Sequence, residues 1–210
     1  MFCSLIIFVK NPVEGQVKTR VAASVGHPKA VEVYVELLEH TKNTMAELLK
    51  IADSRRFKIN VYYGDFINEN DLWNDLNVQK HLQTGADLGE RMKNAFANEF
   101  ATGAASVAIV GSDCLELETK HLKEAFMALD NAEVVIGPAL DGGYYLLGMN
   151  QLQTALFENK PWSQPNLLKE TKAELKAQKI SYELLETLSD IDTWEDYLQA
   201  TKAKVPVYLK

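Results

Sequence analysis

The stretch Leu5-Ile-Ile-Phe-Val-Lys-Asn-Pro-Val-Glu-Gly-Gln-Val-Lys-Thr-Arg20 decides the fold class of this 210-residue chain. It opens with a continuously apolar run, which is typical of a strand that is buried on both faces of a sheet. A polar loop with Pro12 and Gly15 follows, and apolar residues then recur at helical spacing from Lys29 onward. A buried strand, a loop and a long amphipathic helix predict the first unit of an α/β fold.

The rest of the chain repeats this alternation of strand-like and helical segments. Apolar runs at 57–63, 107–110 and 133–136 predict strands, and amphipathic patterns predict helices over 29–52, from 88, from 119, over 166–178 and after Thr193. We therefore expect a mostly parallel central sheet flanked by helices, with the strands at 5–9 and 107–110 in its centre. The segment Val205-Pro-Val-Tyr208 predicts an edge strand, where proline is tolerated.

The composition limits the classes of function. A formal net charge of -7 argues against a broad contact with nucleic acid or anionic lipid, because both need clustered positive charge. The longest apolar run is too short to span a bilayer and the N-terminus does not resemble a signal peptide, so we expect a cytoplasmic protein. Cys3 and Cys114 provide neither a disulfide framework nor a structural zinc site. No repeat or linker divides the chain, which predicts one domain over residues 1–210.

The loop after the first strand is the first candidate for chemistry. Ligands of open α/β sheets bind at the carboxyl ends of the strands, where this loop is expected to lie. Lys18 and Arg20 could neutralise a polyphosphate, Arg20 as a bidentate donor and Lys18 as a point charge. The alternative is a solvated basic loop without a ligand.

The second candidate is Val107-Ala-Ile-Val-Gly-Ser-Asp-Cys114, in which a buried strand ends in a carboxylate. Asp113 could coordinate Mg²⁺ or Mn²⁺, which prefer oxygen ligands, or it could simply cap a turn. Cys114 is a possible nucleophile, but no histidine is near it in sequence, which favours an inert buried thiol.

Two further stretches carry acidic residues in loops. Asp141, Gly142 and Gly143 lie between two apolar runs, where the glycines allow close approach to a ligand, although a hairpin turn explains them equally well. Asp190 and Asp192 point the same way in an extended segment and could meet Asp113 around one or two metal ions. Alternatively, they favour the N-terminus of the following helix through its dipole.

Five motifs of the chain, in this order, carry a resemblance to a known family. They are 10–20 (Lys-x-Pro-x-x-Gly-x-Val-Lys-Thr-Arg), 85–92 (Gly-Ala-Asp-Leu-Gly-Glu-Arg-Met), 111–114 (Gly-Ser-Asp-Cys), 141–148 (Asp-Gly-Gly-Tyr-Tyr-Leu-Leu-Gly) and 190–193 (Asp-Ile-Asp-Thr). With them the chain resembles, over residues 5–198, the GT-A-like transferases described as radical-SAM/selenodomain-associated or nucleotide-diphospho-sugar transferases. It is also similar to the molybdenum-cofactor and phospholactate guanylyltransferases.

The resemblance implies a GT-A fold, in which an N-terminal nucleotide-binding half abuts an acceptor half. It also implies a candidate site. The site comprises catalytic Lys18, Arg20 and Asp113; nucleotide-binding Lys10, Pro12, Gly15, Lys18, Thr19, Arg20, Asp87 and Gly89; substrate-binding Asp141, Gly142, Gly143 and Tyr144; and Asp113, Asp190 and Asp192 as ligands of Mg²⁺ or Mn²⁺.

The chain departs from the family pattern at two positions. Leu115 stands where the family usually has proline, and Leu140 stands where an additional aspartate is common. The second departure removes an acidic side chain, so metal affinity or substrate choice could differ from the family norm.

The leading hypothesis is a metal-dependent transferase that takes a nucleoside diphosphate sugar and a small acceptor. A nucleotidyltransferase that uses an NTP and a phosphorylated small acceptor is the alternative within enzymes. A nucleotide sensor without turnover is the alternative from another class.

Overall fold

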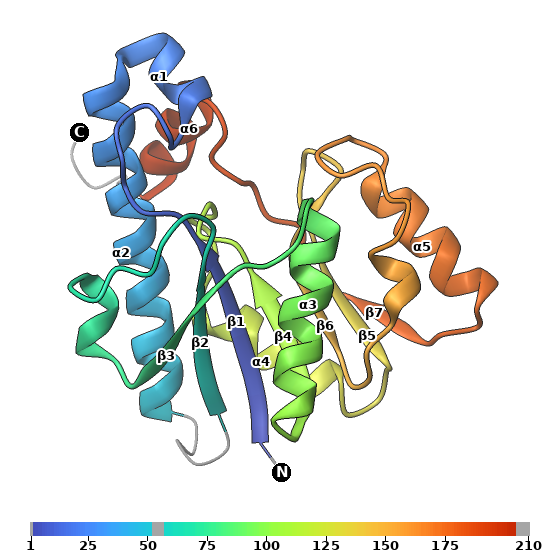
Figure 1. Cartoon of the computed structure of the whole chain (residues 1–210). Coiled ribbons are helices and arrows are strands. Elements are labelled where there is room, and N and C mark those ends of the chain that lie inside the picture. Colours follow the sequence, from blue (N-terminus) through green and yellow to red (C-terminus); the bar gives the residue numbers. More distant parts are fainter. Residues whose placement is uncertain (1, 52–56, 205–210) are drawn as a thin grey trace.

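A computed structural model describes residues 2–51 and 57–204, and within them seven strands form one sheet (Figure 1). Their order across the sheet is β3-β2-β1-β4-β6-β5-β7. The strands are β1 (Phe2–Val9), β2 (Phe57–Tyr63), β3 (Val78–Leu82), β4 (Ala104–Val110), β5 (Val134–Pro138), β6 (Tyr144–Met149) and β7 (Tyr182–Leu184). Neighbouring strands are parallel except where β6 pairs with β4 and with β5. The predicted mostly parallel α/β sheet is therefore confirmed.

The central position of β1 and β4 is also as predicted. β1 pairs with β2 on one side and with β4 on the other. Leu5, Ile6 and Ile7 are fully buried, because helices cover both faces of the sheet at this point. β6 runs against its neighbours since a short turn over residues 139–143 joins it to β5, and so short a connection permits only antiparallel pairing.

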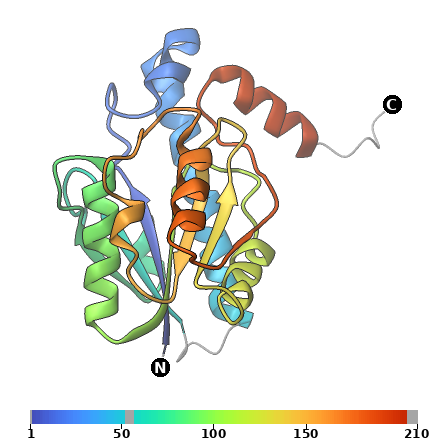
Figure 2. The same cartoon turned by 90° about the vertical axis from the view of Figure 1, so that its right-hand side faces the viewer.

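Helices cover both faces of the sheet (Figures 1 and 2). One core lies between the sheet and α2 and α4, and a second core lies between the sheet and α3 and α5. The alternation of strand side chains explains the two cores, since Leu5 and Ile7 of β1 belong to the first and Ile6 to the second. The helices are α1 (Thr19–Val25), α2 (His27–Ile51), α3 (Leu88–Ala101), α4 (Thr119–Ala128), α5 (Leu167–Ala177) and α6 (Trp194–Lys204), with short 3₁₀ helices η1 (Leu72–Asp75) and η2 (Thr154–Leu156).

Several boundaries differ from the sequence predictions. α2 begins at His27 rather than at Lys29, and the short helix α1 precedes it where only a loop was expected. β3 and β7 were not predicted, because both are short and β3 is a half-buried edge strand with a weak apolar pattern. The predicted helix end at Ala52 and the predicted edge strand 205–208 lie outside the described residues.

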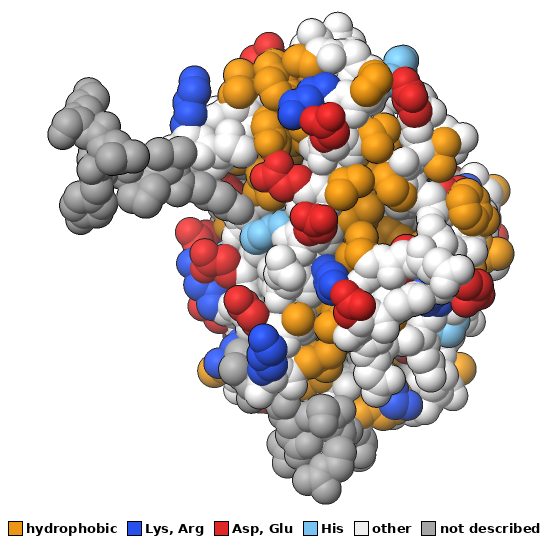
Figure 3. Space-filling model, turned by 90° about the vertical axis from the view of Figure 1, so that its left-hand side faces the viewer, with side chains coloured by type: hydrophobic (Ala, Val, Ile, Leu, Met, Phe, Trp, Pro, Cys, Tyr) orange, Lys and Arg blue, Asp and Glu red, His pale blue; other side chains and the backbone are white. Residues whose placement is uncertain are grey.

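The surface over α2 and η1 carries charges of both signs (Figure 3). Lysine and arginine side chains alternate there with aspartate and glutamate, and apolar side chains show between them. Mixed charge of this kind does not provide the clustered positive potential that a nucleic-acid backbone requires. In the described part of the chain, no helix has both the length and the apolar character that crossing a membrane demands.

Candidate functional site

A cleft of about 680 Å³ lies at the carboxyl ends of β1 and β4 and the beginning of β6. Segments far apart in the sequence meet in it, because the carboxyl ends of parallel strands share one edge of the sheet. The predicted site residues that line the cleft are Lys10, Lys18, Thr19, Arg20, Asp113, Asp141, Gly143, Tyr144, Asp190 and Asp192. Pro12, Gly15, Asp87, Gly89 and Gly142 are not among the lining residues.

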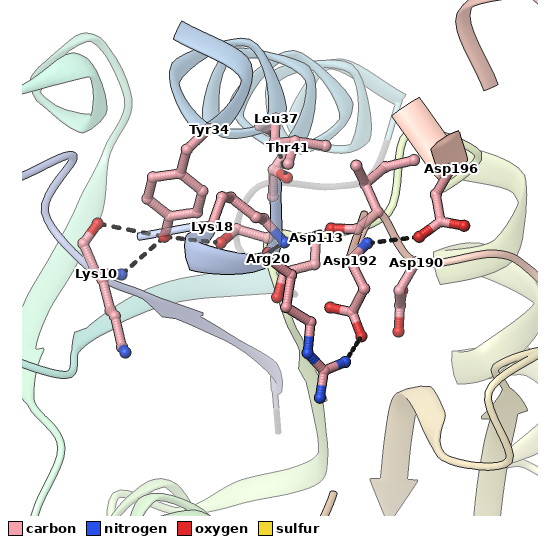
Figure 4. Close-up of polar contacts among 12 residues, drawn as sticks. Lys10, Lys18, Arg20, Tyr34, Leu37, Thr41, Asp113, Asp190, Asp192 and Asp196 are labelled. Atoms are coloured by element: carbon pink, nitrogen blue, oxygen red, sulfur yellow. Dashed lines mark hydrogen bonds and ion pairs between the residues drawn. The ribbon is translucent and has the colours of Figure 1, made fainter. Parts of the chain in front are cut away.

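Lys18 occupies the position just before α1 and links two distant segments of the chain (Figure 4). Its backbone is left-handed, with φ 46° and ψ 46°, a conformation that is uncommon outside glycine and often found at functional sites. Its ammonium group lies 2.5 Å from Asp113 Oδ1 and donates to the carbonyl oxygen of Ile191 at 2.7 Å. Since only 7% of the side chain is exposed, Lys18 is held in place between the two acidic segments.

A second ion pair joins the same regions. Arg20 Nη1 lies 3.1 Å from Asp192 Oδ2, and both side chains remain well exposed (Figure 4). The backbone amide of Ile191 donates to the carbonyl oxygen of Asp113 at 2.8 Å, so the two acidic segments are also joined through the main chain. Each predicted phosphate-binding cation therefore pairs with a predicted metal-binding carboxylate.

The start of α6 is capped by Asp196. Its carboxylate accepts hydrogen bonds from the backbone amides of Asp192 and Thr193, at 3.1 and 2.7 Å. Thr193 Oγ1 in turn accepts from the backbone amide of Asp196 at 3.2 Å. The helix start predicted at Thr193 is therefore confirmed, and the capping contacts are made by Thr193 and Asp196 rather than by Asp190 and Asp192.

Asp190 is the most strongly perturbed carboxyl group of the cleft. Burial, followed by the negative charges of Asp113 and Asp141, raises its pKa from 3.8 to about 7. Asp192 adds to this rise and the Lys18 ammonium opposes it. The carboxyl groups thus repel one another in the cleft, and a bound cation would relieve this repulsion.

The acidic side chains suit a hard divalent cation by their chemistry, since Mg²⁺ and Mn²⁺ prefer carboxylate oxygens. Asp113, Asp190 and Asp192 all line the cleft, and their charges act on one another strongly enough to shift the pKa of Asp190. Within residues 2–51 and 57–204, however, no three acidic, histidine or cysteine side chains already stand as a metal-ligating group. Asp113 instead pairs with Lys18, and Asp192 pairs with Arg20.

Tyr34 of α2 fixes the loop over residues 10–18 to the end of β4 (Figure 4). This loop is named the phosphate-suited loop after the sequence prediction. Its hydroxyl group accepts a hydrogen bond from the backbone amide of Lys10 at 2.9 Å and lies 3.2 Å from Ser112 Oγ. Burial and the charge of Asp113 raise the pKa of Tyr34 to about 12, so the hydroxyl group stays protonated. Tyr34 therefore connects the loop after β1 with the segment that carries Asp113.

The Asp-Gly-Gly sequence forms the hairpin turn between β5 and β6. Asp141 Oδ1 accepts from the backbone amide of Gly143 at 2.8 Å, which closes the turn. Gly142 has φ +90°, and a side chain there would meet the carbonyl oxygen of Pro165 at 2.0 Å. The turn thus requires glycine for conformation and packing, while Asp141 remains exposed beside the cleft.

Asp87 and Gly89 have structural contacts at the start of α3. Asp87 Oδ1 accepts from the backbone amide of Glu90 at 2.8 Å, which confirms the predicted helix cap. A side chain at Gly89 would lie 2.4 Å from Trp162 Nε1, so the glycine lets Trp162 pack on the helix. Trp162 itself lines the cleft, whereas Gly89 does not, so Gly89 affects the cleft by allowing Trp162 to pack against α3.

Cys114 belongs to the lining of the cleft but is buried, with 4% of the residue exposed. Burial and the charge of Asp190 raise the pKa of its thiol to about 12, so the reactive thiolate is not formed at neutral pH. The interpretation of Cys114 as an inert buried thiol is favoured over that of a nucleophile.

Tyr34, Gln83 and Arg91 are among the cleft residues that sequence reasoning missed. Tyr34 follows the helical period of the core residues, and that pattern hides its hydrogen-bonding role. Gln83 follows β3, an unpredicted strand, and donates to the carbonyl oxygen of Tyr62 at 2.9 Å. Arg91 lies in a quoted motif, but nothing in the sequence indicates that it faces the cleft.

Comparison with solved structures defines the class of fold. The chain has the GT-A-like α/β fold of nucleotide-diphospho-sugar transferases and CTP-using transferases. A structure from Desulfovibrio desulfuricans G20, described as a "putative nucleotide-diphospho-sugar transferase", is 27% identical with a TM-score of 0.83, over 99% of this chain and 90% of that one. A CMP:2-keto-3-deoxy-manno-octonic acid synthetase complexed with CTP is 9% identical with a TM-score of 0.56, over 97% of this chain and 98% of that one. The Rv0371C protein of Mycobacterium tuberculosis H37Rv in complex with manganese is 10% identical with a TM-score of 0.57, over 97% and 100%. The last two likenesses concern the fold alone.

The particular family follows from a match over residues 47–164. The chain belongs to the bacterial family DUF2064, whose description is "Uncharacterized protein conserved in bacteria". No curated protein matches the chain.

Proposed function

We propose that the protein is a metal-dependent nucleotide-diphospho-sugar transferase that acts on a small acceptor. The observation that carries the proposal is the pairing in one cleft of two cations with two carboxylates, Lys18 with Asp113 and Arg20 with Asp192. The description of the Desulfovibrio structure agrees with it. A nucleoside diphosphate sugar with its divalent metal ion suits this arrangement, because the diphosphate can replace the carboxylates as partner of the cations and the metal ion can bind the carboxylates.

Asp113, Asp190 and Asp192 would hold the metal ion. When bound, Mg²⁺ or Mn²⁺ would neutralise negative charge on the leaving diphosphate. The complex of Rv0371C with manganese supports this choice of metal for a protein of similar fold. The mutual repulsion of the carboxyl groups in the cleft also supports a bound metal ion, because the ion would relieve it.

Lys18 and Arg20 would bind the diphosphate oxygens and stabilise the charge that develops as the bond to the sugar breaks. The sugar carbon would then bond to a hydroxyl oxygen of the acceptor as its bond to the phosphate oxygen breaks. The nucleoside diphosphate would leave, and the hydroxyl proton would be released to solvent. The left-handed backbone at Lys18 and the anchoring of the loop by Tyr34 support a preorganised position for Lys18, whose side chain is only 7% exposed. Asp141, Gly143 and Tyr144 line the same cleft and would contact the sugar or the acceptor.

A nucleotidyltransferase is the second candidate. It would transfer a nucleotidyl group from an NTP to a phosphorylated acceptor and release pyrophosphate. The likeness in fold to a synthetase complexed with CTP favours it. The same cations and carboxylates would then bind the triphosphate and its metal ion.

We retain from the sequence the predictions of one GT-A-like domain over residues 1–210 and of a cytoplasmic location.

Incubation with nucleotide sugars and with NTPs, each with Mg²⁺ or Mn²⁺, tests the proposal. Chromatography of the nucleotide products separates the candidates. Release of a nucleoside diphosphate from a nucleotide sugar supports the first, and release of pyrophosphate from an NTP supports the second. Tight metal-dependent binding without consumption of any nucleotide would indicate a sensor, and absence of binding contradicts all three.

A further inference from the structure

Arg91 of α3 is a cation of the cleft for which the described residues provide no carboxylate partner. It lines the cleft together with Lys10, Lys18 and Arg20. Its Nε atom donates to the carbonyl oxygen of Gly85 at 3.2 Å, which fixes the direction of the guanidinium group. Among the residues that the structure describes, no acidic side chain lies within ion-pair distance of Arg91 or of Lys10, whereas Lys18 and Arg20 are both paired.

The nearest acidic residues in sequence are committed to the backbone. Glu90 Oε2 accepts from the amide of Ala86 at 2.7 Å, and Asp87 Oδ1 accepts from the amide of Glu90 at 2.8 Å. These contacts form the cap of α3 and hold both carboxylates away from the guanidinium group. The terminal nitrogens of the Arg91 guanidinium group therefore remain available to a ligand, even though the chain as a whole has a net charge of -7.

Arg91 borders an apolar wall of the cleft. Met92 and Leu88 line the cleft from the same helix, and 42% of Leu88 is exposed. Tyr144 and Trp162 continue the wall with their rings packed edge to face, at a centroid distance of 6.4 Å. This wall and its single cation suit a ligand in which an acid group is attached to an apolar or planar body.

The wall and the proposed diphosphate site border the same cleft from opposite faces of the sheet. α3 covers the face of the sheet opposite to α2, whereas the phosphate-suited loop is tied to α2 through Tyr34 (Figures 1 and 2). The diphosphate is already matched by Lys18 and Arg20, so Arg91 is left for a different anion. Resting on the proposed function, we propose that Arg91 recognises a phosphate or carboxylate group of the acceptor.

The test uses pyrophosphate with Mg²⁺ to fill the diphosphate site, followed by titration with phenyl phosphate or phenol in a calorimeter. We expect phenyl phosphate to bind to the wild-type protein and phenol to bind more weakly. Arg91→Gln should lose about tenfold or more of the affinity for phenyl phosphate, because it removes a charged hydrogen-bonding group. Arg91→Lys should recover part of it, and pyrophosphate binding should stay unchanged in both variants.

Lys93→Gln is the matched control. It removes the same charge from the same helix, but Lys93 does not line the cleft and pairs with Glu158 at 3.4 Å. The control should bind phenyl phosphate like the wild type. A loss of pyrophosphate affinity in Arg91→Gln would assign the residue to the donor and overturn the inference, as would unchanged binding of phenyl phosphate or its failure to bind to the wild type at millimolar concentration. Failure of pyrophosphate itself to bind would instead contradict the proposed function.

Discussion

The Lys18 ammonium group lies 2.5 Å from Asp113 Oδ1, and the pair joins the loop after β1 to the end of β4. In the proposed function Lys18 binds the diphosphate and Asp113 binds the metal ion. The ion pair must then open when the ligands bind, and either ligand alone leaves one charge without a partner. Binding of metal and of diphosphate should therefore be positively coupled.

Arg20→Ala should weaken binding without affecting the fold. The Arg20 side chain is 69% exposed, and exposed ion pairs contribute little to stability, so we expect a change in unfolding free energy within about 0.5 kcal/mol. Loss of a charged hydrogen-bonding group should lower pyrophosphate affinity about tenfold or more. Calorimetric titration measures the affinity, with Lys29→Ala as the control because Lys29 has a similar exposed ion pair with Glu32. Equal affinities of Arg20→Ala and the wild type would remove Arg20 from the site.

Asp190→Asn should stabilise the metal-free protein above neutral pH. The pKa of Asp190 is raised to about 7, so the folded wild type holds this proton more tightly than the unfolded chain and loses stability as pH rises from about 4 to 7. Asparagine removes this loss. Since the carboxyl group is only half-buried, we expect a gain of about 1–2 kcal/mol at pH 8 and almost none near pH 4.

Thermal unfolding in a chelator buffer measures this difference, which corresponds to roughly 2–4 °C per kcal/mol for a chain of this size. Asp75→Asn serves as the control, because Asp75 is an exposed carboxylate that pairs with Lys42 outside the cleft. A stability difference between Asp190→Asn and the wild type that does not change with pH would contradict the raised pKa of Asp190.

Tyr34→Phe should lower both stability and ligand affinity. The variant leaves the backbone amide of Lys10 without its hydrogen bond, at a cost of about 1–3 kcal/mol. It also frees the phosphate-suited loop from β4, so pyrophosphate affinity in the presence of metal should fall. Tyr62→Phe is a matched control, since its hydroxyl group donates to the buried Glu99 at 2.7 Å outside the cleft. If both variants lose stability and both keep full affinity, Tyr34 is structural only.

Cys114 should react slowly with thiol reagents in the native protein. Burial raises its pKa to about 12, so thiolate is scarce at pH 8 and the sulfur is also shielded from solvent. Alkylation by iodoacetamide, followed by mass spectrometry of peptides, should label this position only after denaturation. Rapid labelling of the native protein would show that the thiol is accessible.

The sequence predicted the centre of the fold well because its signal there is strong. The continuous apolar runs of β1 and β4 require burial on both faces, and the Asp87 cap marks the start of α3. The edge strand β3 was missed because half-buried residues give a weak pattern. The reversal of β6 follows from the turn at Asp141, which the sequence left open between ligand contact and hairpin.

The candidate site was predictable by residue type but not by pairing. The strand-end rule brings Lys18 and Asp113 to one edge of the sheet, and the structure places both in the cleft. That Lys18 would pair with Asp113 depends on the left-handed backbone at Lys18, and that Arg20 would pair with Asp192 depends on the path of the chain between α5 and α6. No local pattern encodes either. Arg91 escaped notice because its role depends on which neighbouring carboxylates are already engaged.

The coupling of metal and diphosphate binding tests the account most directly. Pyrophosphate is titrated into the wild type and into Asp113→Asn, each with and without Mg²⁺. We expect Mg²⁺ to raise wild-type affinity by at least about fivefold, in the range usual for coupled sites. Asp113→Asn should lose most of this increase, yet bind pyrophosphate without metal at least as tightly as the wild type, because Lys18 no longer faces a competing charge. Full metal dependence in Asp113→Asn, or weaker metal-free binding than in the wild type, would contradict the account.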